Sequence, residues 1–408
     1  MRHDKLRILM QALYSTYSRL VEGTDCRYQR YLYTEIDWQE RLIGIKGARG
    51  VGKTTMLLQH IKLSFKDLSS AFYASLDHIW FSNHTLLELV EYLYTHGVTH
   101  LFLDEVHRYL TWVREIKNIY DSYPDMHIVF TGSSLLEIGQ AEADLSRRLR
   151  TYELRGLSFR EYLAINGIAE LPVFALDDIL TSHMQITASL VSKLKLLPHF
   201  EKYIQKGYYP FHLEATSADS YNERLRQVIN TVIAYDIPAV EKDINYETLV
   251  KAKRLLMILA QTVPFTPNIS TLCATLSTTR NQIIRLLSLL ERSALIRQLF
   301  AEGKKLKTLG KPNKILFDNP DLMMVLAQPA DTGTVRESFF AAMLAPQHSL
   351  HYPPHGDILV DEKFLFEIGG QNKGFGQIRI IPDSYVVADG IETGFGNKIP
   401  LWLFGFLY

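Results

Sequence analysis

The chain has 408 residues, of which 44 are Lys or Arg and 44 are Asp or Glu, so its formal net charge is zero. A neutral chain has no overall field that attracts a polyanion, and any nucleic-acid binding must therefore depend on a local basic patch. With 47% hydrophobic and 22% charged residues, the composition is that of a folded globular protein rather than a disordered one. At roughly 150 residues per domain, the length predicts two or three domains.

Cysteine usage and hydropathy indicate the compartment. Cys26 and Cys273 are far apart in the sequence and lack metal-ligand spacing, which is typical of a reducing environment. The first residues contain several charges and no apolar signal core, and the apolar run at residues 399–408 is too short to span a bilayer. We therefore expect a cytoplasmic protein that does not insert into a membrane.

The N-terminal part of the chain is predicted to form an α/β domain. Residues 1–40 have a helical pattern followed by a loop, and strand and helix patterns alternate from residue 41 onward. The predicted strands are residues 42–46, 71–76, 100–104, 127–131 and 152–154, and the clearest helical patterns are residues 85–94 and 109–121. Such alternation is typical of a parallel sheet with helices on both faces, and a ligand is expected at the carboxyl ends of its strands.

The residues after the first predicted strand match the phosphate-binding loop pattern G-x-x-x-x-G-K-[ST] at every position. They are Gly47, Ala48, Arg49, Gly50, Val51, Gly52, Lys53 and Thr54, and Thr55 follows. Glycines allow backbone N–H groups to surround an anion, Lys53 adds a full charge, and the Thr54 hydroxyl is expected to bind Mg²⁺. An apolar strand precedes the loop and a helical pattern follows it, as the motif requires. The loop therefore predicts binding of a nucleoside triphosphate, ATP, with Mg²⁺.

Two adjacent carboxylates, Asp104 and Glu105, end the third predicted strand. Asp104 is expected to bind the magnesium ion directly or through water. Glu105 is expected to take a proton from the water that attacks the γ-phosphate. A solvated acidic pair is the other interpretation, but the complete phosphate-binding loop upstream favours the catalytic one. Kinases and small GTPases with this loop usually lack the second acid, so the pair favours ATP hydrolysis.

The region at residues 157–245 is predicted to be helical and carries no strong chemical motif. Residues 221–237 have the pattern of a long amphipathic helix. We interpret this region as a helical lid or linker that follows a P-loop ATPase domain at residues 1–156.

Residues 246–320 are predicted to form a winged helix. The predicted elements are helices at 249–259, 269–276 and 279–292 and a hairpin of strands 294–300 and 314–317. The third helix is expected to bury five apolar residues, namely Ile283, Ile284, Leu286, Leu287 and Leu290. Its outward face carries Asn281, Arg285, Ser288 and Arg292. In a helix-turn-helix, this helix enters the major groove of double-stranded DNA.

The charge of this region is basic, but two interpretations stay open. Residues 280–314 contain nine Lys and Arg against two Glu, and three of the lysines, Lys304, Lys305 and Lys307, fall in the predicted wing. Such an excess is typical of a DNA-binding patch. Winged helices in ATPases also pack against the nucleotide domain or a protein partner, and surface lysines are often merely solvated.

The last predicted domain, residues 321–408, has an α/β pattern similar to that of restriction-type nucleases. The predicted elements are a helix at 333–344 and a hairpin of strands 357–360 and 364–368. Asp357 and Glu367 on this hairpin correspond to a metal-holding pair, which in such nucleases is assisted by a lysine two residues after the Glu. That position is Gly369 here, and Lys373 comes four residues later, although a loop that folds back would return it to the pair. We therefore expect a nuclease-like fold without nuclease activity.

Together these features resemble the AAA+ superfamily ATPases of prokaryotes that carry a P-loop domain, a winged helix and a C-terminal domain of unknown function related to restriction-endonuclease folds. The segments that carry the resemblance are residues 47–55, 103–107, 130–134, 157–163, 236–238 and 367–370. The first two segments are specific for ATP chemistry, and the others mainly mark the subfamily.

The resemblance implies further site residues. Thr131 or Ser133 would be the polar sensor of the γ-phosphate at the end of the fourth strand. Arg147 and Arg148 would be candidate arginine fingers that reach a neighbour's nucleotide in a homo-oligomer. The other interpretation of the two arginines is a salt bridge to a nearby acid such as Asp144.

Two classes of function remain open. One is an ATPase whose hydrolysis drives work on DNA or protein. The other is an ATP-gated switch with slow or no turnover, in which bound ATP holds one arrangement of the other domains. The sequence does not name the partner.

Overall fold

The computed structural model describes residues 2–132, 145, 147–241, 243–262, 268–302, 310–327 and 329–408. Five residues of interest lie outside the described residues, namely Ser133, Asp144, Lys304, Lys305 and Lys307. The chain forms two compact units. The first contains Met1–Arg155 and Tyr235–Lys242, and the second contains Gly156–Ala234 and Asp243–Tyr408.

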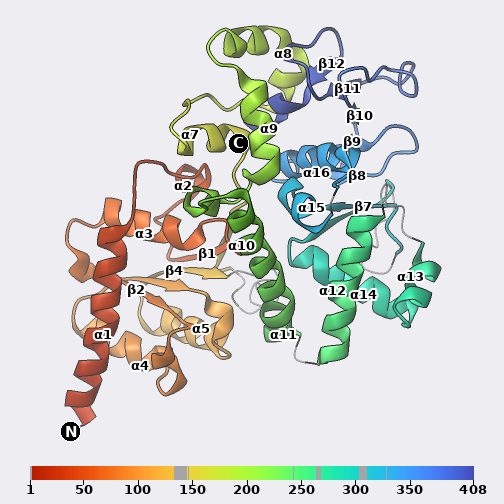
Figure 1. The fold of residues 1–408 in the computed structure, drawn as a ribbon. Coiled ribbons are helices and arrows are strands. Elements are labelled where there is room, and N and C mark those ends of the chain that lie inside the picture. The colour runs from red at the N-terminus through yellow and green to blue at the C-terminus, as the bar shows by residue number, and fades with distance from the viewer. Residues whose placement is uncertain are drawn as a thin grey trace. The chain divides into compact units, whose positions relative to one another are not determined.

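The first unit is built on a five-stranded parallel sheet (Figure 1). Its strands are β1 (Leu42–Lys46), β2 (Ala71–Ser75), β3 (His100–Asp104), β4 (His127–Gly132) and β5 (Arg150–Glu153). They lie in the order β2-β3-β4-β1-β5, and each neighbouring pair is parallel. Strands β1, β3 and β4 are buried over almost their whole length, as apolar strands covered on both faces must be. The predicted parallel sheet is confirmed.

Helices accompany this sheet at the predicted places. They are α1 (Arg2–Gly23), α2 (Leu32–Glu35), α3 (Lys53–Ser64), α4 (Leu86–Thr95) and α5 (Trp112–Ser122). Helix α1 packs on β2 and α3, and it buries Leu13, Tyr17 and Val21 at helical spacing. Helix α4 begins at a capping box in which Thr85 and Glu88 satisfy each other's backbone N–H groups.

The second unit begins with helices and differs from the prediction at one point. The helices are α7 (Phe159–Ile165), α8 (Leu176–Val191), α9 (Leu196–Lys206) and α10 (Ala218–Thr231). The predicted helix at 221–237 is not one continuous α-helix, because a π-helical turn, Val232–Asp236, follows α10 and leads into α11 (Ile237–Val240). Pro238 lacks an N–H, and its ring crowds the carbonyl of residue 234, so the regular hydrogen-bond ladder cannot continue.

Three helices and a hairpin follow in the second unit. They are α12 (Tyr246–Gln261), α13 (Ile269–Thr275), α14 (Arg280–Arg292), β6 (Ile296–Leu299) and β7 (Lys314–Phe317). Helix α14 packs against α12, α13 and β6, and it buries Leu289 instead of the predicted Ile284, which is half-buried. Asn281 and Arg285 lie on its exposed face, as predicted.

The rest of the second unit contains a mixed sheet. Its elements are α15 (Pro320–Leu326), α16 (Thr332–Leu344), β8 (Leu350–His351), β9 (Ile358–Val360), β10 (Phe364–Gly369), β11 (Ser384–Ala388) and β12 (Lys398–Pro400). The strand order is β12-β11-β10-β9-β8, in which β8, β9 and β10 are antiparallel and β10, β11 and β12 are parallel. The predicted hairpin of β9 and β10 is confirmed.

The apolar run at residues 399–408 belongs to the core of the second unit. It continues from β12 into a short 3₁₀ helix, Leu401–Phe406, which packs against α7, α8 and α16. Every residue of this helix is buried. Within the described part of the chain, we find no helix that is long and apolar enough to cross a membrane.

Asp321 on α15 is a buried carboxyl group at the centre of the second unit. It accepts hydrogen bonds from the Tyr208 N–H, at 3.1 Å, and from the Tyr221 hydroxyl. Burial raises the pKa of Asp321 to about 7, despite these hydrogen bonds. In the unfolded chain its pKa is about 3.9. The folded state therefore binds the Asp321 proton more tightly than the unfolded state does.

This difference predicts a pH dependence of stability. The contribution of Asp321 is fully present below about pH 4 and is lost as the pH rises toward 7, by up to about 1.4 kcal/mol per pH unit. Asp321→Asn should remove this part of the dependence, because an amide keeps the acceptor and does not ionise. Urea denaturation at several pH values measures it, with the exposed Asp219→Asn as control. Equal pH profiles for Asp321→Asn and the wild type would contradict the prediction.

Candidate nucleotide-binding site

The loop between β1 and α3 depends on its glycines for separate reasons. Gly50 and Gly52 have φ values of 88° and 98°, in the left-handed region that favours glycine. At Gly47 the limit is space, because a Cβ atom would lie 2.3 Å from the carbonyl oxygen of Leu154. Helix α3 begins at Lys53, directly after Gly52. Its first N–H groups, which have no partner within the helix, are therefore available for an anion.

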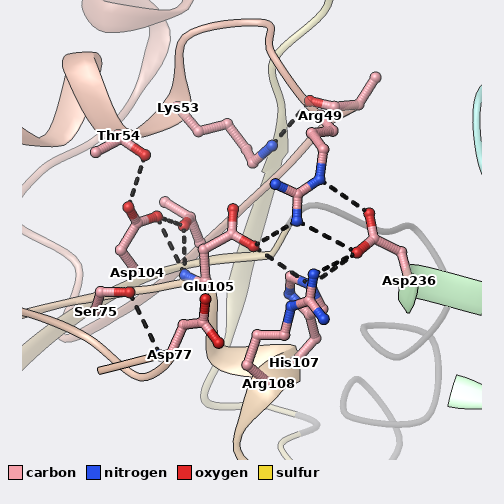
Figure 2. Close-up of polar contacts among 12 residues, drawn as sticks. Arg49, Lys53, Thr54, Ser75, Asp77, Asp104, Glu105, His107, Arg108 and Asp236 are labelled. Carbon is pink, nitrogen blue, oxygen red and sulfur yellow. Dashed lines mark hydrogen bonds and ion pairs between the residues drawn. The ribbon is translucent and has the colours of Figure 1, made fainter. Parts of the chain in front are cut away.

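Lys53 lies within the loop that precedes it (Figure 2). Its ammonium group donates hydrogen bonds to the carbonyl oxygens of Gly47 and Ala48, at 2.8 and 2.9 Å. Its exposed fraction is 5%, and burial lowers its pKa. The carboxylates of Glu105 and Asp104 oppose this shift, but the atoms in direct contact with the ammonium group are neutral carbonyls, and phosphate oxygens would bring negative charge into contact with it.

Asp104 is the polar centre of the site. Its Oδ2 atom accepts hydrogen bonds from the Thr54 hydroxyl at 2.6 Å and from the Tyr73 hydroxyl at 3.0 Å. Its Oδ1 atom accepts from the Thr131 hydroxyl and from the Glu105 N–H. Burial and the neighbouring Asp104 raise the pKa of Tyr73, so this phenol stays protonated and remains a donor. A hydroxyl and a carboxylate in direct contact are the two protein groups that hold Mg²⁺ next to a phosphate-binding loop.

Glu105 adopts an unusual backbone conformation for a residue with a side chain. Its φ and ψ are 54° and 40°, which is the left-handed helical region. Its N–H donates to Asp104 and, at 3.3 Å, to the hydroxyl of Thr131. The side chain is 21% exposed, and its Oε2 atom lies 3.4 Å from Nε2 of His107 and 3.8 Å from Nη2 of Arg49. The strained backbone thus turns this carboxylate toward the loop residue Arg49.

The side chains of Arg49, His107 and Arg108 surround Asp236 beside the loop, and this cluster was not predicted from the sequence (Figure 2). Asp236 ends the π-helical turn, and its side chain is 2% exposed. Arg49 Nε lies 3.2 Å from it, Arg108 Nη2 lies 2.9 Å from it, and His107 Nε2 lies 3.8 Å from it. Two sequence signals pointed to this region, namely the Val-His pair after the acid pair and the Asp-Ile-Pro segment. Both contributed only to the family resemblance, and neither indicated the cluster.

The structure places the other predicted residues as follows. Thr131 contacts both acidic residues, whereas Ser133 lies outside the described residues. Arg148 forms an ion pair with Asp121 at 3.1 Å, and Arg147 is exposed with a φ of 71°. The structure thus contains a salt bridge at Arg148, and its partner is Asp121.

In the second unit, two lysines form ion pairs with carboxylates on the mixed sheet and on helix α16. Lys314 contacts Glu337 at 2.8 Å and Asp357 at 3.6 Å, and Lys373 contacts Glu367 at 2.6 Å. The chain after Gly369 folds back and brings Lys373 next to this glycine. A Cβ atom at Gly369 would lie only 2.7 Å from Cδ of Lys373. Burial raises the pKa of Glu337 to about 7, although Lys314 opposes this shift. Among the described residues, no group of three His, Cys, Asp or Glu side chains is placed to hold a metal ion.

Comparison with known proteins adds to this geometry. Residues 39–163 match the family described as an AAA domain. This stretch contains the loop, the acid pair and Thr131, and with the five-stranded parallel sheet it has the fold of P-loop AAA+ ATPases. Residues 197–329 match a second family, described as a domain of unknown function (DUF8612), which spans the predicted winged helix.

Two similar proteins come from Methanocaldococcus jannaschii. Uncharacterized protein MJ1637 is 29% identical over 400 residues, which cover 90% of this chain and 83% of that protein. Uncharacterized protein MJ1544 is 26% identical over 200 residues, which cover 47% of this chain and 41% of that protein.

Solved structures with a partial likeness include two proteins. AMPPCP-bound DnaA from Aquifex aeolicus has 15% identity and a TM-score of 0.26, with 64% of this chain and 84% of that chain covered. The Aeropyrum pernix ORC1 protein in complex with DNA has 12% identity and a TM-score of 0.32, with 80% and 91% covered.

The packing at Gly47 predicts the effect of one added methyl group. Gly47→Ala should shift the loop, because its Cβ atom would meet a backbone oxygen that cannot rotate away. We expect ATP affinity to fall at least about tenfold, which corresponds to about 1.4 kcal/mol. Titration with a fluorescent ATP analogue measures it. Gly23→Ala is the matched control, since a Cβ atom there has no atom within 4 Å. Unchanged affinity in Gly47→Ala would contradict the prediction.

Proposed function

We propose that the protein binds ATP with Mg²⁺ at residues 47–55 and hydrolyses it to ADP and phosphate. The observation that carries the proposal is the 2.6 Å hydrogen bond between the Thr54 hydroxyl and Asp104, with Glu105 as the next residue. This is the arrangement that P-loop enzymes use to hold Mg²⁺ and to place a base beside it. The match of residues 39–163 to the AAA domain family supports the proposal.

Each group then has one task. The N–H groups of the loop and the ammonium of Lys53 bind the β- and γ-phosphates, and Lys53 exchanges its two carbonyl partners for phosphate oxygens. Thr54 and Asp104 would hold magnesium, which would supply positive charge to the phosphate oxygens. Glu105 accepts a proton from a water molecule. The oxygen of that water bonds to the γ-phosphorus while the bond from this phosphorus to the ADP oxygen breaks.

Two substitutions should separate binding from hydrolysis. Lys53→Ala should abolish ATP binding, because it removes the full charge from a cradle that is otherwise made of dipoles. Glu105→Gln should keep ATP binding and reduce hydrolysis by about 10²-fold or more, because an amide cannot accept the proton. Nucleotide titration and phosphate release on both variants are the measurements. Hydrolysis at the wild-type rate in Glu105→Gln would show that another group is the base.

One observation favours the second candidate function, an ATP-gated switch with slow turnover. The Oε2 atom of Glu105 faces both His107 and Arg49, so this oxygen would exchange these contacts for one with a water molecule before it takes a proton. Turnover distinguishes the two functions. An enzyme that drives work should be stimulated by its substrate, whereas a switch should co-purify with nucleotide and turn over rarely.

We also propose that residues 246–320 form a winged helix that binds double-stranded DNA. The support is the order of α12, α13 and α14 followed by the β6–β7 hairpin, and the exposure of Asn281 and Arg285 on α14. Helix α14 would then be the recognition helix, and Arg285 would approach base edges.

DNA binding predicts a salt dependence. Replacing Lys304, Lys305 and Lys307 together by alanine should weaken binding to every duplex sequence. It should also reduce the slope of log K against log salt by about 0.9 for each lost phosphate contact. Electrophoretic mobility shifts at several salt concentrations measure this. A triple alanine variant at the exposed Lys193, Lys195 and Lys202 of the same unit is the control. If no duplex binds at low salt with ATP present, the module contacts protein instead.

For residues 321–408 we propose a nuclease-like fold without nuclease activity. The support is that Gly369 stands where such nucleases carry the lysine, and that Lys314 contacts both Glu337 and Asp357. Incubation of the protein with plasmid DNA and Mg²⁺ tests this proposal, and no cleavage is expected.

A further inference from the structure

We infer that Arg49 binds the γ-phosphate of ATP within its own chain, and that Asp236 holds Arg49 when ATP is absent. ATP would thus take Arg49 from Asp236 and loosen the segment at residues 235–241. This inference rests on the proposed binding of ATP at the loop. It adds a catalytic residue, a positioning residue and a route by which ATP acts on the rest of the chain.

The position of Arg49 supports a contact between this side chain and the γ-phosphate. Its guanidinium comes from the third residue of the phosphate-binding loop and lies 3.8 Å from the Glu105 carboxylate. The base must lie within hydrogen-bond reach of the attacking water, and that water must lie next to the γ-phosphorus. A guanidinium beside this base therefore lies close to the place where negative charge develops. Arginines at such places stabilise the transition state of phosphoryl transfer.

The contacts between Arg49 and Asp236 support the idea that this carboxylate competes with phosphate for Arg49. Its Nε atom donates to Oδ2 of Asp236 at 3.2 Å, and its Nη2 atom lies 3.4 Å from Oδ1. Burial raises the pKa of Asp236, but hydrogen bonds from His107 and Arg49 more than offset it. Its pKa is therefore lowered overall, and the carboxylate stays ionised. A phosphate group offers more oxygens and more charge than one carboxylate does, so it can compete for the same guanidinium.

The other contacts of Asp236 show what happens to this carboxylate when Arg49 moves to the phosphate. Its charge stays compensated, but one of its oxygens loses a hydrogen-bond donor. Oδ1 keeps Arg108 at 2.9 Å and His107 at 3.8 Å, so the buried charge remains compensated. Oδ2 would lose the hydrogen bond that Arg49 donates to it. A buried oxygen without a donor is unfavourable, and a small movement of its segment into water relieves this. The π-helical turn that ends at Asp236, and Pro238 after it, interrupt the regular α-helical hydrogen-bond ladder between α10 and α11.

The segment has a special place in the chain. Residues Tyr235–Lys242 belong to the first unit, whereas the residues before and after them belong to the second. A change in how firmly Asp236 is held therefore acts on the chain at the point where it passes between the units. This gives ATP a covalent route to the second unit, without any neighbouring subunit.

Binding measurements give the first test. Asp236→Asn should tighten binding of a non-hydrolysable ATP analogue at least about fivefold, because it removes the competitor for Arg49. In the Arg49→Ala background the same substitution should have no effect. A residue that only stabilised the fold would weaken binding or leave it unchanged when substituted. The exposed Asp125→Asn is the control. Equal or weaker binding in Asp236→Asn would overturn the inference.

Turnover gives the second test. Arg49→Ala should lower the rate of phosphate release by about 10³-fold or more. Arg49→Lys should restore analogue binding but little of the rate, because an ammonium group lacks the planar fork. The exposed Arg19→Ala should behave as the wild type. If Arg49→Ala keeps its rate while an Arg147/Arg148 double alanine variant loses it, and the rate rises with protein concentration, the arginine comes from a neighbour and the inference fails.

Hydrogen exchange on the full chain separates failure of this inference from failure of the proposed function. With Mg²⁺ and the ATP analogue, exchange should slow in residues 47–54 and quicken in residues 235–241, whereas ADP should produce only the first change. Asp236→Asn should exchange quickly at 235–241 without nucleotide. If neither segment responds, ATP binding itself is wrong. If residues 47–54 are protected and residues 235–241 do not change, ATP binds and the exchange of partners is wrong.

Discussion

The candidate site depends on one carboxylate, Asp104, because its hydrogen bonds join side chains from three other elements at one point. The hydroxyls of Thr54, Tyr73 and Thr131 reach it from α3, β2 and β4, and the N–H of Glu105 reaches it from the next residue. A carboxylate that is 3% exposed is stable only when its oxygens are satisfied in this way. The same bonds fix where the strand ends, and therefore where Glu105 turns.

Charge pairing around this centre is close to complete. Lys53 contacts loop carbonyls, Arg49 contacts Asp236 and Glu105, and Arg108 contacts Asp236. A triphosphate entering this site would find few cations waiting without partners, so it would have to exchange partners with carbonyls and carboxylates. Part of its binding energy is then used inside the protein, which is how binding at one place alters another.

Local patterns were sufficient to predict most of the fold. Apolar runs gave the five strands of the first sheet, and the loop motif gave its place relative to β1 and α3, because both signals lie within a few consecutive residues. Asp236 could not be found in this way, since its partner Arg49 is 187 residues away in the sequence and no period links them. Spacing alone did not place Lys373 for a related reason: its ammonium reaches Glu367 only because the intervening loop folds back, which the sequence left as an alternative.

The return of the chain to the first unit at Tyr235–Lys242 means that this unit is not one continuous stretch of sequence. A fragment that stops near residue 155 would contain the whole sheet, the loop and the acid pair. It would nevertheless lack the anion around which Arg49, His107 and Arg108 gather, and the partly buried guanidinium groups of Arg49 and Arg108 would lose their shared counter-charge. Domain boundaries drawn from the family match alone would therefore divide an ion cluster, and the smallest autonomous version of this unit includes a segment from far along the chain.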